Sequence, residues 1–145
     1  MPPQPTPLRT GEKRSGIVIR AREKWNHTGV TVSAGERYSF DTQGTWSDMG
    51  IRRDGNGFST REVPWVSRWL LQRFESKRRV PSENWFCLIG SVDENAGHLF
   101  RIGRQRIDWV VEAGVTGELV CFANDVESAY WNNIGSITLT IARTA

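Results

Sequence analysis

The stretch GELVCFANDVESAYWNNIGSITLTI, residues 117–141, contains two runs of strand-forming residues separated by a polar loop. The first run, GELVCFA, and the last, SITLTI, are rich in apolar and β-branched residues, which favours β-strands. Between them the loop holds a carboxylate, Asp125, and two neighbouring amides, Asn132 and Asn133. The stretch therefore predicts a pair of strands whose connection gathers oxygen-bearing side chains.

Shorter runs of the same kind occur along most of the chain and are separated by Gly-rich turns. Residues 37–42 alternate between polar and apolar, as in a half-buried strand, and residues 85–92 are almost continuously apolar, as in a central strand. The alternation of strands and helices that is typical of nucleotide-binding sheets is missing from the sequence. The pattern predicts an all-β fold, an antiparallel β-sandwich. The remaining predicted strands cover residues 16–20, 28–32, 98–103 and 107–111.

One segment, residues 61–78, departs from the strand pattern and predicts a single inserted helix. Pro64 suits a first helical turn, and apolar residues recur after it with a helical period. Such a stripe usually packs a helix on a sheet, and we expect that here; a ligand platform is the alternative. The stripe consists of Trp65, Val66, Trp69, Leu70 and Phe74.

The length of 145 residues fits one domain of ordinary size. We expect the Pro-rich residues 1–15 to form a disordered N-terminal arm and residues 16–145 to form a single β-sandwich domain. No apolar run approaches the ~20 residues of a membrane span, and the N-terminus lacks the apolar centre of a secretory signal. We expect a soluble protein that is cytoplasmic or exported by another route.

The formal net charge is +3, with basic clusters at residues 77–79 and 101–106. A basic patch is compatible with nucleic acid or with an anionic surface. No predicted helix carries a continuous basic stripe, and the aromatic residues match no RNA-binding signature. We interpret the clusters as solvated surface and expect no nucleic-acid partner.

Cysteine and histidine residues do not indicate a metal or catalytic site. Cys87 and Cys121 lie inside apolar runs, without a CxxC pair or a Cys/His metal spacing. We expect buried free thiols, with a disulfide between them as the alternative. His27 and His98 are isolated in the sequence.

The oxygen-bearing loop suits a hard cation. Calcium binds roughly six to eight oxygen atoms from carboxylates, amides, main-chain carbonyls and water. Since Asp125 alone would offset only part of the charge of the ion, Asp48, with Asp54 behind it, is a candidate second acid. Gly135 would let the chain turn back into a strand. A metal with open positions could hold vicinal hydroxyls of a sugar. The alternative is an ordinary loop whose Asp and Asn side chains bond to nearby backbone.

The loop sequence NDVESAYWNNIGS, residues 124–136, resembles the calcium loop of the PA-IL (LecA-like) galactose-binding lectins, which reads NDVPGTYGNNSGS. Flanking stretches are also similar: TGVxVxxGExYxF at 28–40, GxW at 44–46 and WFxLIG at 85–90. The resemblance implies a small jelly-roll-like β-sandwich, of the galactose-binding-domain kind, in which sugar hydroxyls bind calcium directly.

The resemblance also implies a set of calcium ligands. It assigns the side chains of Asp125, Asn132 and Asn133 to Ca²⁺. It adds the main-chain carbonyls of Ala129, where the family has Thr, and of Met49.

Sugar contacts follow the family less closely. The galactose lectins carry an HPDQG stretch whose His and Gln touch the sugar, and residues 53–57 read RDGNG in its place. Trp131 replaces a Gly of the family motif; its ring could stack on a sugar or pack down and narrow the site. The predicted sugar contacts are Asp125, Val126, Asn132, Asp54, Asn56 and Trp131.

Together these patterns predict a calcium-dependent carbohydrate-binding protein, a lectin and not an enzyme, for galactose or a related sugar. Because linked sites gain avidity, we also expect a homo-oligomer. The alternative is a β-sandwich protein-interaction module that has lost sugar binding. A hydrolase ranks third, because glycosidases need two acids flanking the scissile bond and no acid spacing here demands such a pair.

Overall fold

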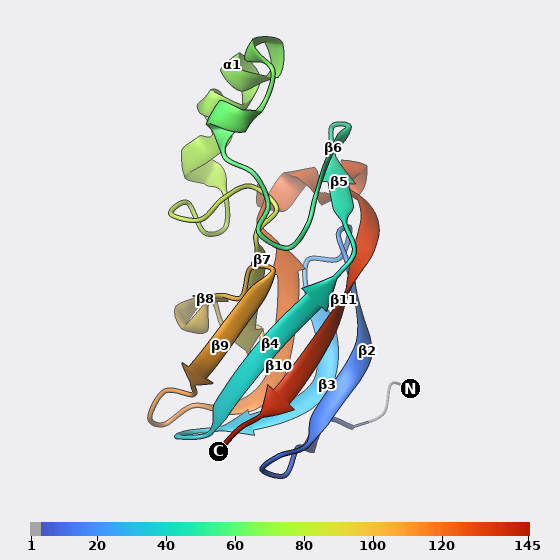
Figure 1. The fold of residues 1–145 in the computed structure, drawn as a ribbon. Coiled ribbons are helices and arrows are strands. Elements are labelled where there is room, and N and C mark those ends of the chain that lie inside the picture. Colours follow the sequence, from blue (N-terminus) through green and yellow to red (C-terminus); the bar gives the residue numbers. More distant parts are fainter. Residues whose placement is uncertain (1–3) are drawn as a thin grey trace.

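The structure is a computed structural model that describes residues 4–145. Two β-sheets pack face to face, and one helix projects from one end of the sandwich (Figure 1). The predicted all-β sandwich with an inserted helix is confirmed. The first sheet has the order β1 (Thr6–Pro7), β3 (Asn26–Ser33), β10 (Thr116–Ala123), β7 (Leu88–Val92) and β8 (Phe100–Arg101). The second has the order β6 (Ile51–Arg53), β5 (Trp46–Asp48), β11 (Ile134–Arg143), β4 (Arg37–Gln43) and β9 (Gln105–Val110), and β2 (Lys13–Arg20) also pairs with β11.

The helical elements are short. The α-helix α1 spans Trp65–Phe74, and the 3-10 helices are η1 (Thr60–Glu62), η2 (Glu75–Lys77), η3 (Ala96–His98) and η4 (Glu127–Asn132). Within residues 4–145 no helix is both long and apolar enough to cross a bilayer. The strand pairs are antiparallel except for β1 with β3.

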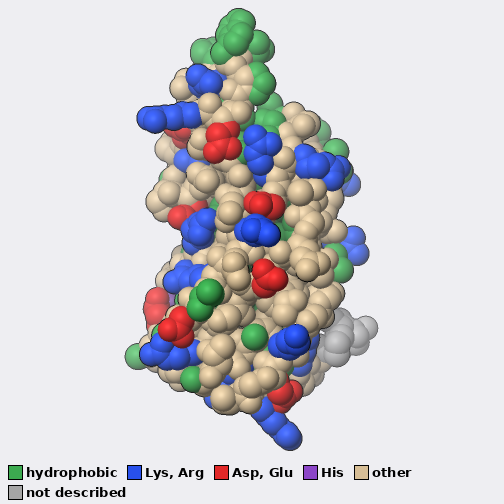
Figure 2. All heavy atoms as spheres, in the orientation of Figure 1, with side chains coloured by type: hydrophobic (Ala, Val, Ile, Leu, Met, Phe, Trp, Pro, Cys, Tyr) green, Lys and Arg blue, Asp and Glu red, His purple; other side chains and the backbone are tan. Residues whose placement is uncertain are grey.

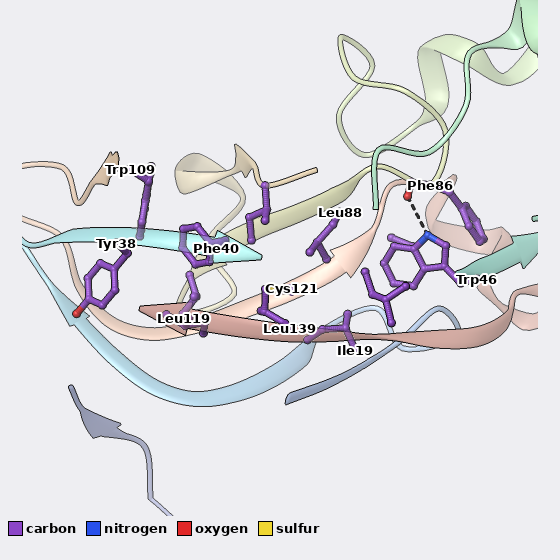
Figure 3. Close-up of a cluster of buried hydrophobic side chains, with 14 of the residues drawn as sticks. Ile19, Tyr38, Phe40, Trp46, Phe86, Leu88, Trp109, Leu119, Cys121 and Leu139 are labelled. Atoms are coloured by element: carbon purple, nitrogen blue, oxygen red, sulfur yellow. Dashed lines mark hydrogen bonds between the residues drawn. The ribbon is translucent and has the colours of Figure 1, made fainter. Parts of the chain in front are cut away.

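Alternating side chains of both sheets form the core between them (Figure 3). On β11, Ile137, Leu139 and Ile141 are buried while the residues between them face outward, as a half-buried strand requires. Strand β7 is buried at every position, which explains its continuous apolar sequence. At the helix end of the core, the Trp46 indole donates a hydrogen bond of 3.2 Å to the carbonyl of Phe86.

The two cysteines are buried free thiols, as predicted. Burial raises the pKa of Cys87 to about 11 and that of Cys121 still further. Both therefore act as small apolar side chains of the core.

The N-terminal segment differs from its prediction. Residues 4–15 are not a disordered arm: β1 pairs with β3, Leu8 is buried, and β2 already begins at Lys13. Proline is tolerated in an edge strand, and the apolar Leu8 gives this Pro-rich segment a side chain to bury. Residues 1–3 of the predicted arm lie outside the described residues.

Helix α1 forms where it was expected but does not pack its apolar stripe on a sheet. Trp65 is 78% exposed and Trp69 is 63% exposed, whereas Leu71 is the buried residue of the helix. The helix extends away from the sandwich (Figure 1), so that its tryptophan-bearing face points outward. The predicted orientation was therefore wrong.

Candidate functional site

The connection between β10 and β11 is fixed by its first residue, Asn124. The Asn124 amide oxygen accepts a hydrogen bond from the main-chain N–H of Val80 at 2.9 Å. Its amide nitrogen donates to the carbonyls of Val80, Glu83 and Asn84 at 2.9, 3.2 and 3.0 Å. Asn124 thus clamps the loop that follows η2 against the end of β10, a structural role that sequence reasoning missed.

Next, the chain curls through η4 and returns to β11. The Tyr130 hydroxyl donates to the carbonyl of Ala123, and Arg79 donates to that hydroxyl at 3.0 Å. The main-chain N–H of Asn133 donates to the carbonyl of Tyr130 at 3.2 Å. Gly135 then has a φ of +93°, the left-handed conformation that a glycine adopts freely, as predicted.

Strand pairing brings Asp48 next to the connection between β10 and β11. Strand β5 pairs with the start of β11, with Trp46 opposite Gly135 and Ser47 opposite Ile134. Continuing this antiparallel register places Asp48 level with Asn133. Two segments distant in the sequence therefore meet at the end of the sandwich from which α1 projects.

Four side-chain oxygens in this region are buried and have no hydrogen-bond donor: Asp48 Oδ1, Asp125 Oδ2, Asn132 Oδ1 and Asn133 Oδ1. The other polar side-chain atoms of Asp125 and Asn133 are paired: Asp125 Oδ1 accepts a hydrogen bond from the N–H of Val126 at 2.7 Å, and Asn133 Nδ2 donates to the carbonyl of Ala21 at 3.0 Å. Leaving a buried polar atom unpaired costs ~1–3 kcal/mol. Four such atoms in one region make it a candidate site for a bound ion or ligand.

The surroundings of both carboxylates disfavour their ionised forms. Burial raises the pKa of Asp48 to about 7, and the nearby negative charge of Asp125 raises it in the same direction. The main-chain N–H of Met49 partly opposes this shift. Burial also raises the pKa of Asp125, and the hydrogen bond from the N–H of Val126 opposes that shift. A cation between them would reverse both shifts.

The donor set selects the kind of cation. In residues 4–145 no group of three or more His, Cys, Asp or Glu side chains is placed to hold a metal. The oxygens available are two carboxylates and two amides, which suit calcium better than a transition metal. The residues present therefore fit the predicted Ca²⁺ loop.

A cavity of roughly 260 Å³ opens beside Asp48, Asp125 and Asn132. The loop and Asp48 form one side, and α1 forms another through side chains that include the buried Leu71. Trp131 lies at its rim and is 74% exposed, so its ring has not packed down to fill the site. The lining comprises Asp48, Met49, Leu70, Leu71, Phe74, Trp85, Asp125, Val126, Ser128, Ala129, Trp131 and Asn132.

Most of the predicted site residues meet at this cavity, but Asp54 and Asn56 do not line it. The Asn56 amide oxygen accepts hydrogen bonds from Arg101 at 3.0 Å and from the N–H of Arg104 at 2.8 Å. Asp54 accepts from the N–H of Asn56 at 2.9 Å. Both residues brace a turn, so the structure does not bring them to the predicted sugar site. Asn133 lies in the wall behind Asp125 and borders a neighbouring hollow.

The contribution of α1 to the wall of the cavity was not predicted, because the apolar stripe of a helix does not identify the distant segment against which it will lie. Leu70 and Phe74 line the cavity although they were expected to pack on a sheet. Trp85 was assigned only to a strand, yet it also lines the cavity.

The fold is that of a lectin-like β-sandwich. No family model and no curated protein matches the sequence. One similar solved structure is described as the EclA N-terminal domain, a PllA-like lectin; it is 18% identical, with a TM-score of 0.63 over 90% of this chain and 97% of that chain. At this identity the similarity shows the fold alone, so the resemblance to PA-IL lectins is supported only as a lectin-like fold.

Proposed function

We propose that the protein binds carbohydrate through a Ca²⁺ ion held by the loop between β10 and β11. The observation that carries the proposal is the group of four unpartnered buried oxygens, three of which belong to residues that line one cavity. The similarity to a fold described as a lectin supports carbohydrate as the ligand class.

Carboxylates, side-chain amides and main-chain carbonyls of this chain would all coordinate the ion. Asp48 and Asp125 supply two negative charges, and Asn132 and Asn133 supply neutral oxygens. The carbonyls of Ala129 and Met49 are the further ligands implied by the PA-IL resemblance, and both residues border the cavity. The bound ion supplies an electrophilic anchor for vicinal hydroxyls.

The cavity would accommodate a saccharide unit, with aromatic and apolar walls. The exposed ring of Trp131 is available to stack on the apolar face of a sugar. Leu70 and Phe74 form an apolar wall from α1. The mechanism is binding without bond cleavage, and galactose or a related sugar is the proposed ligand. A homo-oligomer would raise the avidity of such a shallow site.

A glycan array in calcium and in chelator tests the proposal. We expect binding that needs calcium, is lost in Asp125→Asn and persists in Asp54→Asn, which removes a carboxylate outside the cavity. If calcium stabilises the fold but no glycan binds, sugar recognition is refuted and the interaction module replaces it. Binding that is equally strong in chelator would contradict the role of the ion.

A further inference from the structure

The outward face of α1 is an exposed apolar surface. Five large apolar side chains of this helix are exposed by more than a third, although soluble proteins usually bury such a group. They are Trp65 at 78%, Val66 at 65%, Trp69 at 63%, Leu70 at 39% and Phe74 at 37%. We call these five residues the α1 apolar face.

Basic side chains accompany this face. Residues 65–77, which form α1 and η2, contain three Arg or Lys residues against one Glu, an excess of two positive charges. Arg73 lies over the Trp69 ring at 4.9 Å from its centroid, and Lys77 lies 5.3 Å from that of Phe74. Figure 2 shows hydrophobic side chains at the tip formed by α1, with Lys and Arg side chains just below them. Aromatic rings beside cations suit the boundary between lipid headgroups and acyl chains.

We propose that α1 docks on an anionic phospholipid surface, with Trp65, Trp69 and Phe74 entering the headgroup region and Arg73 and Lys77 contacting lipid phosphates and carboxylates. Charge decides between this occupant and a second copy of the chain. Pairing two α1 faces would bring like charges together, which disfavours association, whereas an anionic surface complements them.

Docking also sets the position of the candidate sugar site. Leu70 and Phe74 belong to the α1 apolar face and line the cavity together with Met49 and Trp131. A membrane-docked helix therefore holds the cavity beside the headgroups, where the sugars of glycolipids lie. This consequence rests on the proposed function, while the docking itself does not.

Vesicles that lack sugar lipids test the docking separately. The probe is phosphatidylcholine vesicles with and without phosphatidylserine, in chelator, so that neither the Ca²⁺ site nor a sugar contributes. The protein should co-sediment with the phosphatidylserine vesicles, with a blue shift of Trp fluorescence. The double variant Trp65→Ser/Trp69→Ser should bind at least roughly tenfold more weakly. Ile107→Ser, at a 73% exposed position on β9, is the matched control and should bind like the parent protein.

Charge variants complete the test. Arg73→Gln and Lys77→Gln should each weaken binding roughly fivefold, and Arg22→Gln, on the exposed turn after β2, should change it little. Absence of binding to phosphatidylserine vesicles, or equal binding to neutral ones, would overturn the proposal. So would a dimer in vesicle-free solution that Trp65→Ser/Trp69→Ser converts to a monomer, since the face would then be covered by a second copy.

Discussion

Asp48 gives the proposed cation site a testable pH dependence. In the metal-free protein its pKa is raised from 3.8 to about 7, so the folded state holds its proton more tightly than the unfolded state does. Ionisation of Asp48 therefore lowers the stability of the metal-free protein as pH rises from about 4 through 7. Asp48→Asn should stabilise the chelated protein at pH ~8, by on the order of a few kcal/mol, and should reduce the stabilisation by calcium. Urea unfolding at pH ~5 and ~8, with chelator and with calcium, measures both effects.

The Asp48→Asn variant can also contradict the proposed cation site. If Asp48→Asn destabilises the chelated protein at pH ~8 and leaves the response to calcium intact, Asp48 is not part of a cation site. Asp54→Asn is the control, because that carboxylate does not line the cavity.

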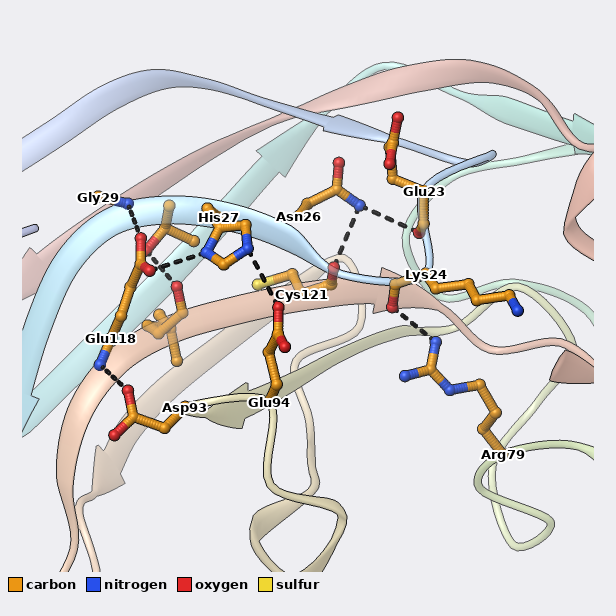
Figure 4. Close-up of polar contacts among 12 residues, drawn as sticks. Glu23, Lys24, Asn26, His27, Gly29, Arg79, Asp93, Glu94, Glu118 and Cys121 are labelled. Atoms are coloured by element: carbon orange, nitrogen blue, oxygen red, sulfur yellow. Dashed lines mark hydrogen bonds and ion pairs between the residues drawn. The ribbon is translucent and has the colours of Figure 1, made fainter. Parts of the chain in front are cut away.

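His27 gives a second, independent pH dependence. Its ring bridges Glu118 at 2.8 Å and Glu94 at 3.1 Å, linking β3 and β10 to the turn after β7 (Figure 4). The hydrogen bond to Glu118 is the largest cause of the raised pKa of His27. The stabilisation is complete below its ordinary pKa of 6.5 and is lost as pH rises through the raised value. It should be small, since the side chain is 57% exposed.

His27→Gln should remove this loss of stability, which sets in as the pH rises above 6.5. Glu94→Gln should remove a smaller part of it, because Glu118 is the main partner. Thermal melting of the three proteins as a function of pH makes the comparison. An unchanged pH profile in His27→Gln would show that the bridge does not stabilise the fold.

The proposed ligands of the loop could be grouped from the sequence because they are near neighbours in the chain. Asp125, Asn132 and Asn133 meet as expected, since the curl of η4 is a local structure. Asp54 and Asn56 were misplaced because their oxygens are used by main-chain N–H groups and Arg101, partners that the sequence does not reveal.

Helix α1 projects from the sandwich and has a single buried side chain. Leu71 is its buried side chain, so Leu71→Ala should loosen the helix on the sandwich more than it lowers the global stability. Hydrogen exchange should become faster in residues 60–77 and stay unchanged in β10 and β11. Trp65→Ala, at an exposed position, should leave exchange unaltered. Equal protection of α1 in Leu71→Ala and the parent protein would show that another contact holds the helix.

The helix also shows which part of an element the sequence determines. The helical period and Pro64 located α1 within the predicted range 61–78, since both are local signals. A periodic apolar stripe identifies a face of the helix but not what covers that face. The N-terminal segment shows a similar effect, because the burial of Leu8 depends on strands that come later in the chain.

At the scale of the whole molecule, the sandwich was predictable and the cavity was not. Alternating strands separated by Gly-rich turns determine two sheets with a shared core. The cavity is assembled from β5, α1 and the loop after β10, which are separated by long stretches of chain. The shape of the cavity depends on how these segments pack against one another, and a local sequence pattern does not predict that packing.

Calcium binding to the chelator-stripped protein is the most direct test of the cation site, and isothermal titration measures it. The four unpartnered oxygens predict saturable binding of about one ion per chain, which Asp125→Ala should abolish while the strands remain folded by circular dichroism. A parent protein that shows no saturable calcium binding, or an Asp125→Ala variant that binds calcium as the parent does, would contradict it.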